Sequence, residues 1–203
     1  MSTFEQRIAE ALSQQLPING TYIEAIYHGI LALGGSVFAQ TADSATVSAT
    51  TTPTSLIGAG VGNFKFPANT LQEGDTFHLK VGGLLKNIGA SGLIFKLSGA
   101  TELLETGMMG NNGTPSTIID RPWELELDLT IRSTGGSGTV ILVGEFNWAG
   151  FLNANDVGVS ANRWNFHQSS SIDTTVDNEL DLTVELGDLT SAIYSQLTYL
   201  NKI

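Results

Sequence analysis

The chain has no cysteine and few basic residues, and each of these features excludes certain kinds of site or partner. Its 203 residues include 9 Lys and Arg against 20 Asp and Glu, which gives a formal net charge of −11. The absence of cysteine excludes disulfide frameworks, thiolate zinc sites, iron–sulfur clusters and cysteine nucleophiles. Because affinity for DNA or RNA comes mainly from Lys and Arg that displace counterions from phosphates, the charge argues against a nucleic acid partner. Anionic membrane surfaces are disfavoured for the same reason.

Long hydrophobic runs and targeting segments are also lacking. The longest apolar stretch, residues 23–33, is interrupted by Glu24, Tyr27 and His28. It is shorter than the roughly 20 apolar residues that cross a bilayer as a helix. No basic segment is followed by an apolar run and a small-residue cleavage site, so we expect no signal peptide. The sequence therefore predicts a protein without a membrane span.

Residues 1–35 have a different hydrophobic pattern from the rest of the chain. Apolar residues recur there at intervals of three and four, which predicts two amphipathic helices separated by a turn at Asn19 and Gly20. The apolar stripe of the first predicted helix consists of Phe4, Ile8, Leu12 and Leu16. Two interpretations remain open for this N-terminal α-helical arm. Either both helices pack on the following domain, or they form an oligomerisation or docking arm.

The remainder of the sequence predicts a β-sandwich. Residues 36–62 are rich in Thr, Ser and Gly, which suggests a linker that either contains short edge strands, such as residues 45–50 and 55–57, or is disordered throughout. From residue 63 to residue 203, apolar and polar residues alternate in several segments, most clearly from Trp123 to Ile131. Further strands are expected at residues 64–66, 76–81, 93–97, 139–148, 164–167, 180–186 and 192–200, with 139–148 central and 192–200 closing the fold. About eight antiparallel strands with uneven loops are typical of a jelly-roll.

No local motif for catalysis, cofactor binding or metal binding is present, and we predict none of these sites. The chain contains neither a G-x-S-x-G nucleophile motif nor a phosphate-binding G-x-x-x-x-G-K-[ST] motif. The three histidines are far apart in sequence, and none belongs to a local zinc-binding pattern. His78 alternates with Phe77 and Leu79, so we expect it to face solvent.

Two groups of acidic residues could nevertheless take part in catalysis or in metal binding. Glu124, Glu126 and Asp128 share one face of a predicted strand at spacings of about 7 Å. Glycosidases use carboxylate separations of this order. Any strand face exposed to solvent would show the same pattern, and we favour this second interpretation. The acidic segment 173–181 could supply oxygen ligands to Ca²⁺, but it lacks the spacing of an EF-hand.

Aromatic and amide residues gather between positions 146 and 166. The candidate ligand-binding or interface residues are Phe146, Trp148, Phe151, Arg163, Trp164 and Phe166. Aromatic rings stack on the C–H faces of sugars while amides bind the hydroxyls, so the group suits carbohydrate. The same aromatic residues could instead anchor one subunit to another or belong to the core. These three interpretations stay open at the level of sequence.

One segment resembles β-sandwich virion structural proteins of tailed phages and large DNA viruses. It reads N-F-K-F-P-A-N-T-L-Q-E-G-D-T-F-H-L-K over residues 63–80, and is followed by a Gly-Gly pair and G-L-I-F-K-L at 92–97. The later L-D-L-T-V at 180–184 is similar to a strand near the end of such domains. In the motif, Pro67 would stop a strand while Asn69 and Gly74 form turns. The resemblance covers about residues 53–203.

The resemblance implies a tumour-necrosis-factor-like jelly-roll with a structural, non-enzymatic role on the virion surface. Expected positions are a capsid decoration, minor capsid, spike or tail-fibre protein, made in the host cytoplasm and located in the virion. Such domains often assemble around a threefold axis, which implies a homotrimer in contact with other capsid or tail proteins. The alternative is a carbohydrate- or receptor-binding module that uses the Trp148–Trp164 loops, and both roles can coexist.

The acidic charge is unevenly distributed along the chain. Residues 1–100 hold six carboxylates against five Lys and Arg, whereas residues 101–203 hold fourteen against four. The excess could serve solubility alone. Alternatively, the near-neutral first half docks on a partner while the acidic second half faces solvent. On the second interpretation, the sequence predicts a position on the outside of the particle, away from packaged DNA.

Overall fold

Antiparallel β-strands make up all the regular structure of the residues that can be described. The computed structural model describes residues 36–86, 92–109, 120–149, 161–187 and 191–203, and residues 36–203 form one unit. Its strands form two facing sheets, so the expected mainly β sandwich is confirmed. Within these ranges, no helix is long and apolar enough to cross a membrane. The predicted helical arm, with its stripe of Phe4, Ile8, Leu12 and Leu16, lies outside the described residues.

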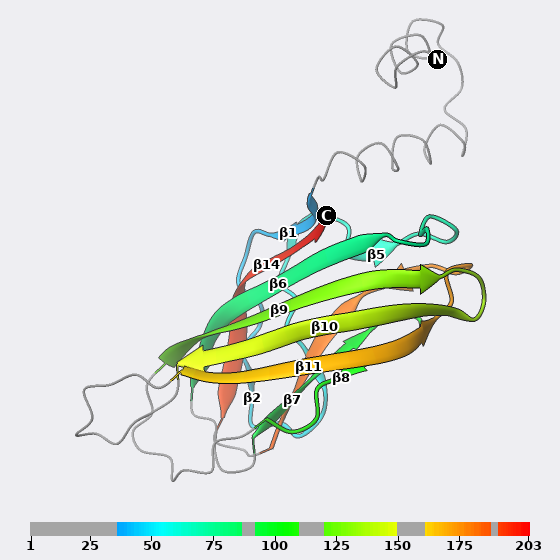
Figure 1. Ribbon diagram of the computed structural model, residues 1–203. Helices are drawn as coiled ribbons and strands as arrows, with labels where there is room; N and C mark the ends of the chain where they lie inside the picture. The colour runs from blue at the N-terminus through cyan, green and yellow to red at the C-terminus, as the bar shows by residue number, and fades with distance from the viewer. Residues whose placement is uncertain (1–35, 87–91, 110–119, 150–160, 188–190) are drawn as a thin grey trace, which may run out of the picture. The chain divides into compact units, whose positions relative to one another are not determined.

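The larger sheet contains all the long strands of the described unit, and its neighbouring strands run antiparallel (Figure 1). Its order is β11 (Ala161–Ile172), β10 (Gly138–Ala149), β9 (Asp120–Ser133), β6 (Thr76–Lys86), β14 (Ala192–Lys202), β1 (Ser36–Gln40) and β4 (Gly60–Gly62), and β2 (Val47–Ser48) pairs with β14. The segment expected to be central, residues 139–148, has a partner strand on each side. The segment expected to close the fold, β14, pairs with both β6 and β1.

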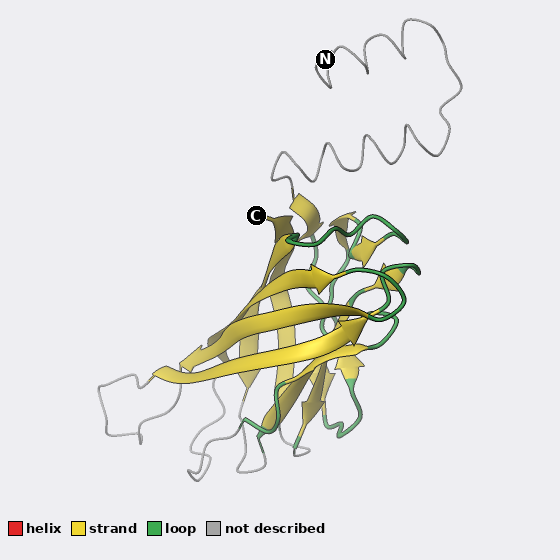
Figure 2. Ribbon diagram, turned by 45° about the vertical axis from the view of Figure 1, so that its right-hand side comes forward, coloured by secondary structure: helices red, strands yellow, loops and turns green. Residues whose placement is uncertain are grey.

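The smaller sheet lies behind the larger one, as the turned view in Figure 2 shows. Its order is β3 (Thr54–Ser55), β13 (Asp181–Leu186), β7 (Leu93–Ser98) and β8 (Glu102–Glu105). A separate two-stranded ribbon pairs β5 (Lys65–Phe66) with β12 (Asn178–Glu179). The ring of Phe66 in this ribbon packs on Phe77 of β6, with centroids 4.5 Å apart. The ribbon is thereby attached to the core.

The core lies between the two sheets and follows directly from the alternation of the sequence. In β9 every second residue from Trp123 to Ile131 is at most 3% exposed, which confirms the predicted inward face. The same alternation is confirmed at residues 76–81, 93–97 and 180–186. Phe95 of β7 joins the layers, since its ring centroid lies 5.6 Å from that of Trp123 and 5.1 Å from that of Phe146. Full burial of each such side chain stabilises the fold by about 1.5–3 kcal/mol.

Residues 36–62, expected to be a linker with edge strands, pair within both sheets. β1 lies between β14 and β4 in the larger sheet, and β3 extends the smaller one. The rings of Phe38 and Phe64 pack with centroids 5.3 Å apart. The buried Ser195 Oγ lies within hydrogen-bond distance of two acceptors, Gln40 Oε1 and the carbonyl oxygen of Leu56, which share its single proton. The unit therefore begins at Ser36, because a few buried contacts hold a segment whose composition is otherwise that of a linker.

Candidate functional site

The outward face of β6, β9, β10 and β11 is a regular grid of polar side chains. Because the four strands pair in continuous register, their outward residues form rows that cross the sheet. The rows are His78–Asp128–Val143–His167, Lys80–Glu126–Glu145–Asn165 and Gly82–Glu124–Asn147–Arg163. Neighbouring strands lie about 4.8 Å apart, so adjacent members of a row are within reach of each other. We call this surface the outer face.

Lys80 lies between two carboxylates at one end of the outer face. Its Nζ is 2.7 Å from an oxygen of Glu124 and 2.7 Å from an oxygen of Glu126. Hydrogen bonds to Glu124 and Glu126 raise the pKa of Lys80, and the hydrogen bond from Lys80 lowers the pKa of Glu126. A general acid in glycoside hydrolysis needs a raised pKa, the opposite of the shift on Glu126. This arrangement is that of a solvated ion-pair cluster, the interpretation favoured from the sequence.

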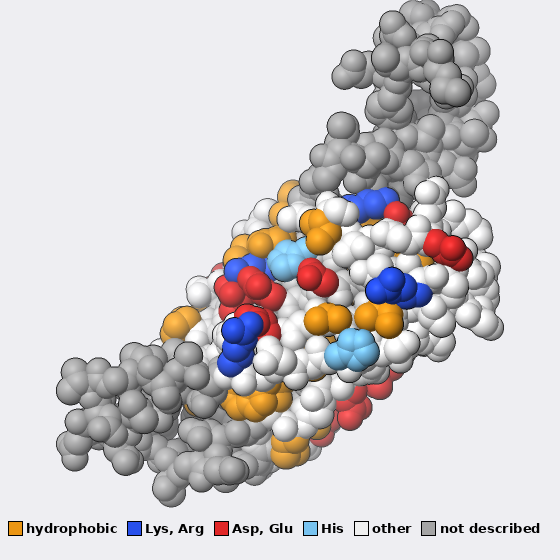
Figure 3. Space-filling model, viewed as in Figure 1, with side chains coloured by type: hydrophobic (Ala, Val, Ile, Leu, Met, Phe, Trp, Pro, Cys, Tyr) orange, Lys and Arg blue, Asp and Glu red, His pale blue; other side chains and the backbone are white. Residues whose placement is uncertain are grey.

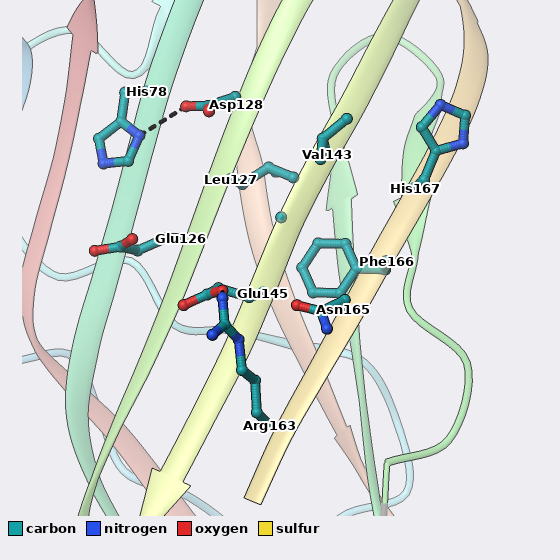
Figure 4. Close-up of a pocket in the computed structure, with 11 residues that line it drawn as sticks. His78, Glu126, Leu127, Asp128, Val143, Glu145, Arg163, Asn165, Phe166 and His167 are labelled. Carbon is teal, nitrogen blue, oxygen red and sulfur yellow. Dashed lines mark hydrogen bonds and ion pairs between the residues drawn. The ribbon is translucent and has the colours of Figure 1, made fainter.

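Two further pairs connect strands across the outer face (Figure 4). His78 Nδ1 lies 2.8 Å from Asp128 Oδ1, so the histidine faces outward as predicted. Arg163 of β11 forms an ion pair with Glu145 of β10. The second oxygen of Glu145 accepts a hydrogen bond from Asn147 Nδ2 at 2.7 Å. Glu145 therefore has a partner for each of its two oxygens.

Between these pairs the outer face is hollowed into an open depression of about 600 Å³. Polar groups of β6 and β9 border one side, and those of β10 and β11 border the other (Figure 4). Among its apolar lining residues, Val143 points outward, whereas Leu127, Gly144 and Phe166 belong to the inward phase of their strands. Val143 is 50% exposed, and Figure 3 shows hydrophobic side chains exposed between two histidines on this side of the protein. The depression is therefore mostly polar, and Val143 is the one outward apolar side chain among its lining residues.

Gly144 lies on the inward phase of β10, directly opposite Phe166 of β11. A Cβ built at Gly144 would lie 2.8 Å from Cε2 of Phe166 and would overlap the backbone oxygen of Glu126. Because the glycine has no side chain, the Phe166 ring closes onto the β10 backbone. Because Gly144 and Phe166 share the inward phase with Phe146 and Trp164, this contact lies on the core side of the sheet.

Two polar side chains on the rim have no hydrogen-bond partner among the described residues. Asn165 and His167 are both exposed and lie on the same side of β11. Two residues along a strand span about 7 Å. The amide of Asn165 offers donors and an acceptor, and the imidazole of His167 offers one of each when neutral. These groups are free to bind a ligand.

The structure separates the aromatic candidates into a buried and an accessible group. Phe146 and Trp148 are at most 2% exposed and point into the sandwich, so burial favours the core interpretation for both. Trp164 is half-buried, with its ring centroid 5.5 Å from that of Phe146. Arg163 is exposed on the outer face, whereas Phe166 is half-buried and lies on the inward phase of β11 with Trp164. The remaining candidate, Phe151, lies outside the described residues.

The acidic segment considered for calcium stabilises a turn through its own contacts. Asp177 pairs with Lys65 at 2.7 Å and accepts a hydrogen bond from the backbone N–H of Ala68. Asp173 accepts hydrogen bonds from the backbone and hydroxyl of Thr175, which lower its pKa. Among the described residues, no group of three or more His, Asp or Glu side chains is placed to hold a metal ion.

The fold and the depression define this protein as an antiparallel β-sandwich with a polar, hollowed face. No protein-family model, curated protein or solved structure matches the chain. The strand order, the register of the outer face and the chemistry of the depression are therefore the basis for inferring its function.

Proposed function

We propose that this chain is a non-enzymatic structural protein of a virion surface that assembles as a symmetric oligomer, a trimer. Within the particle it would be a capsid decoration, minor capsid, spike or tail-fibre component. Its sandwich would be a jelly-roll of the tumour-necrosis-factor-like type. The observation that carries this proposal is the order of the strands in the two sheets.

The strand order supports the jelly-roll because the chain repeatedly crosses between sheets. β6 pairs with β9, although β7 and β8, which lie between them in sequence, belong to the smaller sheet. β14 pairs with β6, although β13, which precedes β14, also belongs to the smaller sheet. Such crossings produce Greek-key connections, from which jelly-rolls are built. On this interpretation the β10–β11 hairpin extends the larger sheet at its edge.

The turn within the motif at residues 63–80 gives the resemblance a structural basis. Asn69 and Gly74 both have positive φ, at 61° and 89°. Asp75 is 8% exposed, accepts a hydrogen bond from the backbone N–H of Gln72, and pairs with Lys202 at 2.7 Å. The motif therefore ties the start of β6 to the end of β14. This explains the spacing of its Asn and Gly-Asp residues as a requirement of the fold.

Light scattering on the purified full chain tests the assembly. We expect a mass three times the 21.5 kDa of one chain. If the predicted arm drives assembly, Leu12→Lys should lower the mass to that of one chain, because it places a charge in the apolar stripe. Gln14→Lys, off the stripe, should leave it unchanged. A full chain that remains a single copy at all concentrations contradicts the proposed oligomer.

A further inference from the structure

We propose that part of strand β11 pairs with the same strand of a second copy of this chain, related by a two-fold axis at Asn165. The contact is separate from that of the proposed trimer, and the proposal does not depend on the trimer. Three observations carry it: the unpaired backbone along part of β11, the aromatic side chains beside it, and the absence of acidic residues from the strand.

β11 is the edge strand of the larger sheet, and it has few of the features that usually protect such an edge (Figure 1). It pairs with β10 along its full length of 12 residues without a bulge. Its sequence, residues 161–172, contains no proline and no lysine, and Arg163 is its one arginine. Natural proteins use bulges, prolines and charged side chains to keep edge strands from pairing with another chain. β11 is therefore suited to such pairing.

The smaller sheet covers one half of this edge. The carbonyl oxygen of Ser171 accepts a hydrogen bond from Thr101 Oγ1, just before β8. The side chain of Gln168 accepts another from the backbone N–H of Glu105, at the end of β8. Beyond β8 the chain returns to β7, where Met109 forms a bridge with that strand. These contacts with β11 therefore stop at Gln168.

Residues 163–167 form the open half of the edge. The bond to the Ser171 carbonyl shows which backbone groups point away from β10, and every second residue of a strand points its groups to the same side. Those residues in the open half are Arg163, Asn165 and His167. Within the part of the chain that the structure describes, no loop or strand hydrogen-bonds to this side of the open half. Each of the three residues therefore offers an N–H and a C=O to a partner strand.

Antiparallel pairing about Asn165 makes the open half complementary to itself. Asn165 faces its own counterpart in a hydrogen-bonded pair, as an interface with two-fold symmetry requires. Trp164 faces Phe166 of the second copy in a non-hydrogen-bonded pair, where side chains lie closest. Both rings are half-buried on the inward phase of β11, so the second strand would cover them. Aromatic pairs of this kind stabilise antiparallel strands by about 0.2–1 kcal/mol each.

The charge of the strand favours a second copy as its partner. Each copy has a net charge of −11, so most approaches of two copies bring carboxylates together, but residues 161–172 contain no Asp or Glu. Arg163, which would face His167 of the second copy, is paired with Glu145 of its own chain. Stable interfaces bury about 1,200–2,000 Å² in total, more than a short pair of strands provides. We therefore expect a weak contact that forms as the protein concentration rises.

Chemical cross-linking tests the proposal, because the chain has no cysteine of its own. The Cα atoms of a hydrogen-bonded antiparallel pair lie about 5.5 Å apart. We expect Asn165→Cys, treated at high concentration with a short bismaleimide reagent, to give a band of two linked chains on a denaturing gel. Ser169→Cys is the matched control, since Ser169 is exposed on the same side of β11. Its two copies would stand about 27 Å apart, so no such band should form.

Asn165→Asp provides a second test, since it would place two carboxylates opposite each other at the axis, where like charges destabilise pairing. In sedimentation equilibrium, the mass of the unchanged protein should rise with concentration above its value in dilute solution. Asn165→Asp should keep the dilute mass. Ser169→Asp adds the same charge away from the axis and should behave as the unchanged protein does. Thermal unfolding verifies that each variant is folded.

The proposal is overturned if neither cysteine variant is cross-linked, or if Ser169→Cys is cross-linked as much as Asn165→Cys. A mass that does not rise with concentration, or a rise that persists in Asn165→Asp, would also overturn it. The mass in dilute solution tests the proposed trimer alone, so the two proposals fail separately.

Discussion

Replacement of Phe95 by alanine tests how strongly contact between the two sheets stabilises the fold. Phe95 is fully buried, and the rings of Trp123 and Phe146 from the larger sheet surround it. Truncating a buried phenylalanine costs about 3–5 kcal/mol, because lost burial is joined by the cost of the cavity. We expect about 4 kcal/mol, since rigid rings resist collapse into the space. In a domain of this size, that loss lowers Tm by about 8–16 °C.

The assay is thermal unfolding of the full chain followed by circular dichroism. Ile94→Ala is the matched control, because Ile94 precedes Phe95 on β7 but points to the opposite side of the sheet. Its loss should be below about 1 kcal/mol, the range of β-propensity effects. Equal losses for Phe95→Ala and Ile94→Ala would refute the assignment of Phe95 to a core between two facing sheets.

Three further predictions test other parts of the structure by the same unfolding assay. Gly83→Ala should destabilise the protein by about 1–3 kcal/mol, because its Cβ would overlap a backbone oxygen of β14. Gly82→Ala should be close to neutral, since its Cβ would meet only one atom, at 3.2 Å. Ser195→Ala should cost about 1–3 kcal/mol, because it removes the one hydroxyl proton that Gln40 Oε1 and the carbonyl of Leu56 share. Lys80 lowers the pKa of Glu126, so the stability from this pair is present above the unfolded pKa and is lost as pH falls through the lower folded pKa. Acidification below about pH 4.5 should therefore lower the Tm of the unchanged protein more than that of Glu126→Gln, and identical pH profiles would contradict the pairing.

The long strands could be predicted because one face of each is buried. In β9 the inward residues from Trp123 to Ile131 are apolar and the intervening ones are mostly charged, so period-two alternation is visible in the sequence itself. His78 could be placed outward on the same basis. By contrast, β8 was not predicted, since its four residues place Leu103 and Leu104 side by side with no alternation.

The partners of each strand could not be predicted, because pairing depends on tertiary register rather than local pattern. Lys80 is more than 40 residues from Glu124 and Glu126, yet it binds both. The segment 36–62 was expected to be partly linker for the same reason, since its contacts with β14 and β13 are long-range. The composition of a segment does not predict such long-range contacts.

The candidate site illustrates the same limit of local sequence reasoning. The sequence shows the cluster of aromatic rings between positions 146 and 166. Which rings face solvent depends on the side of the sheet to which each strand turns its odd-numbered and its even-numbered residues. Phe146 and Trp148 fall on the inward phase of β10, whereas Arg163 falls on the outward phase of β11. The depression itself draws residues from four strands and needed the sheet register to be recognised.

The central proposal is that this chain belongs to the surface of a virus particle. Mass spectrometry of purified virus particles tests it most directly when intact particles are first labelled with a membrane-impermeant, lysine-reactive reagent. The account predicts that the chain is a particle component and that exposed lysines of its sandwich carry the label. A chain that is absent from purified particles, or present but unlabelled until they are disrupted, would contradict it.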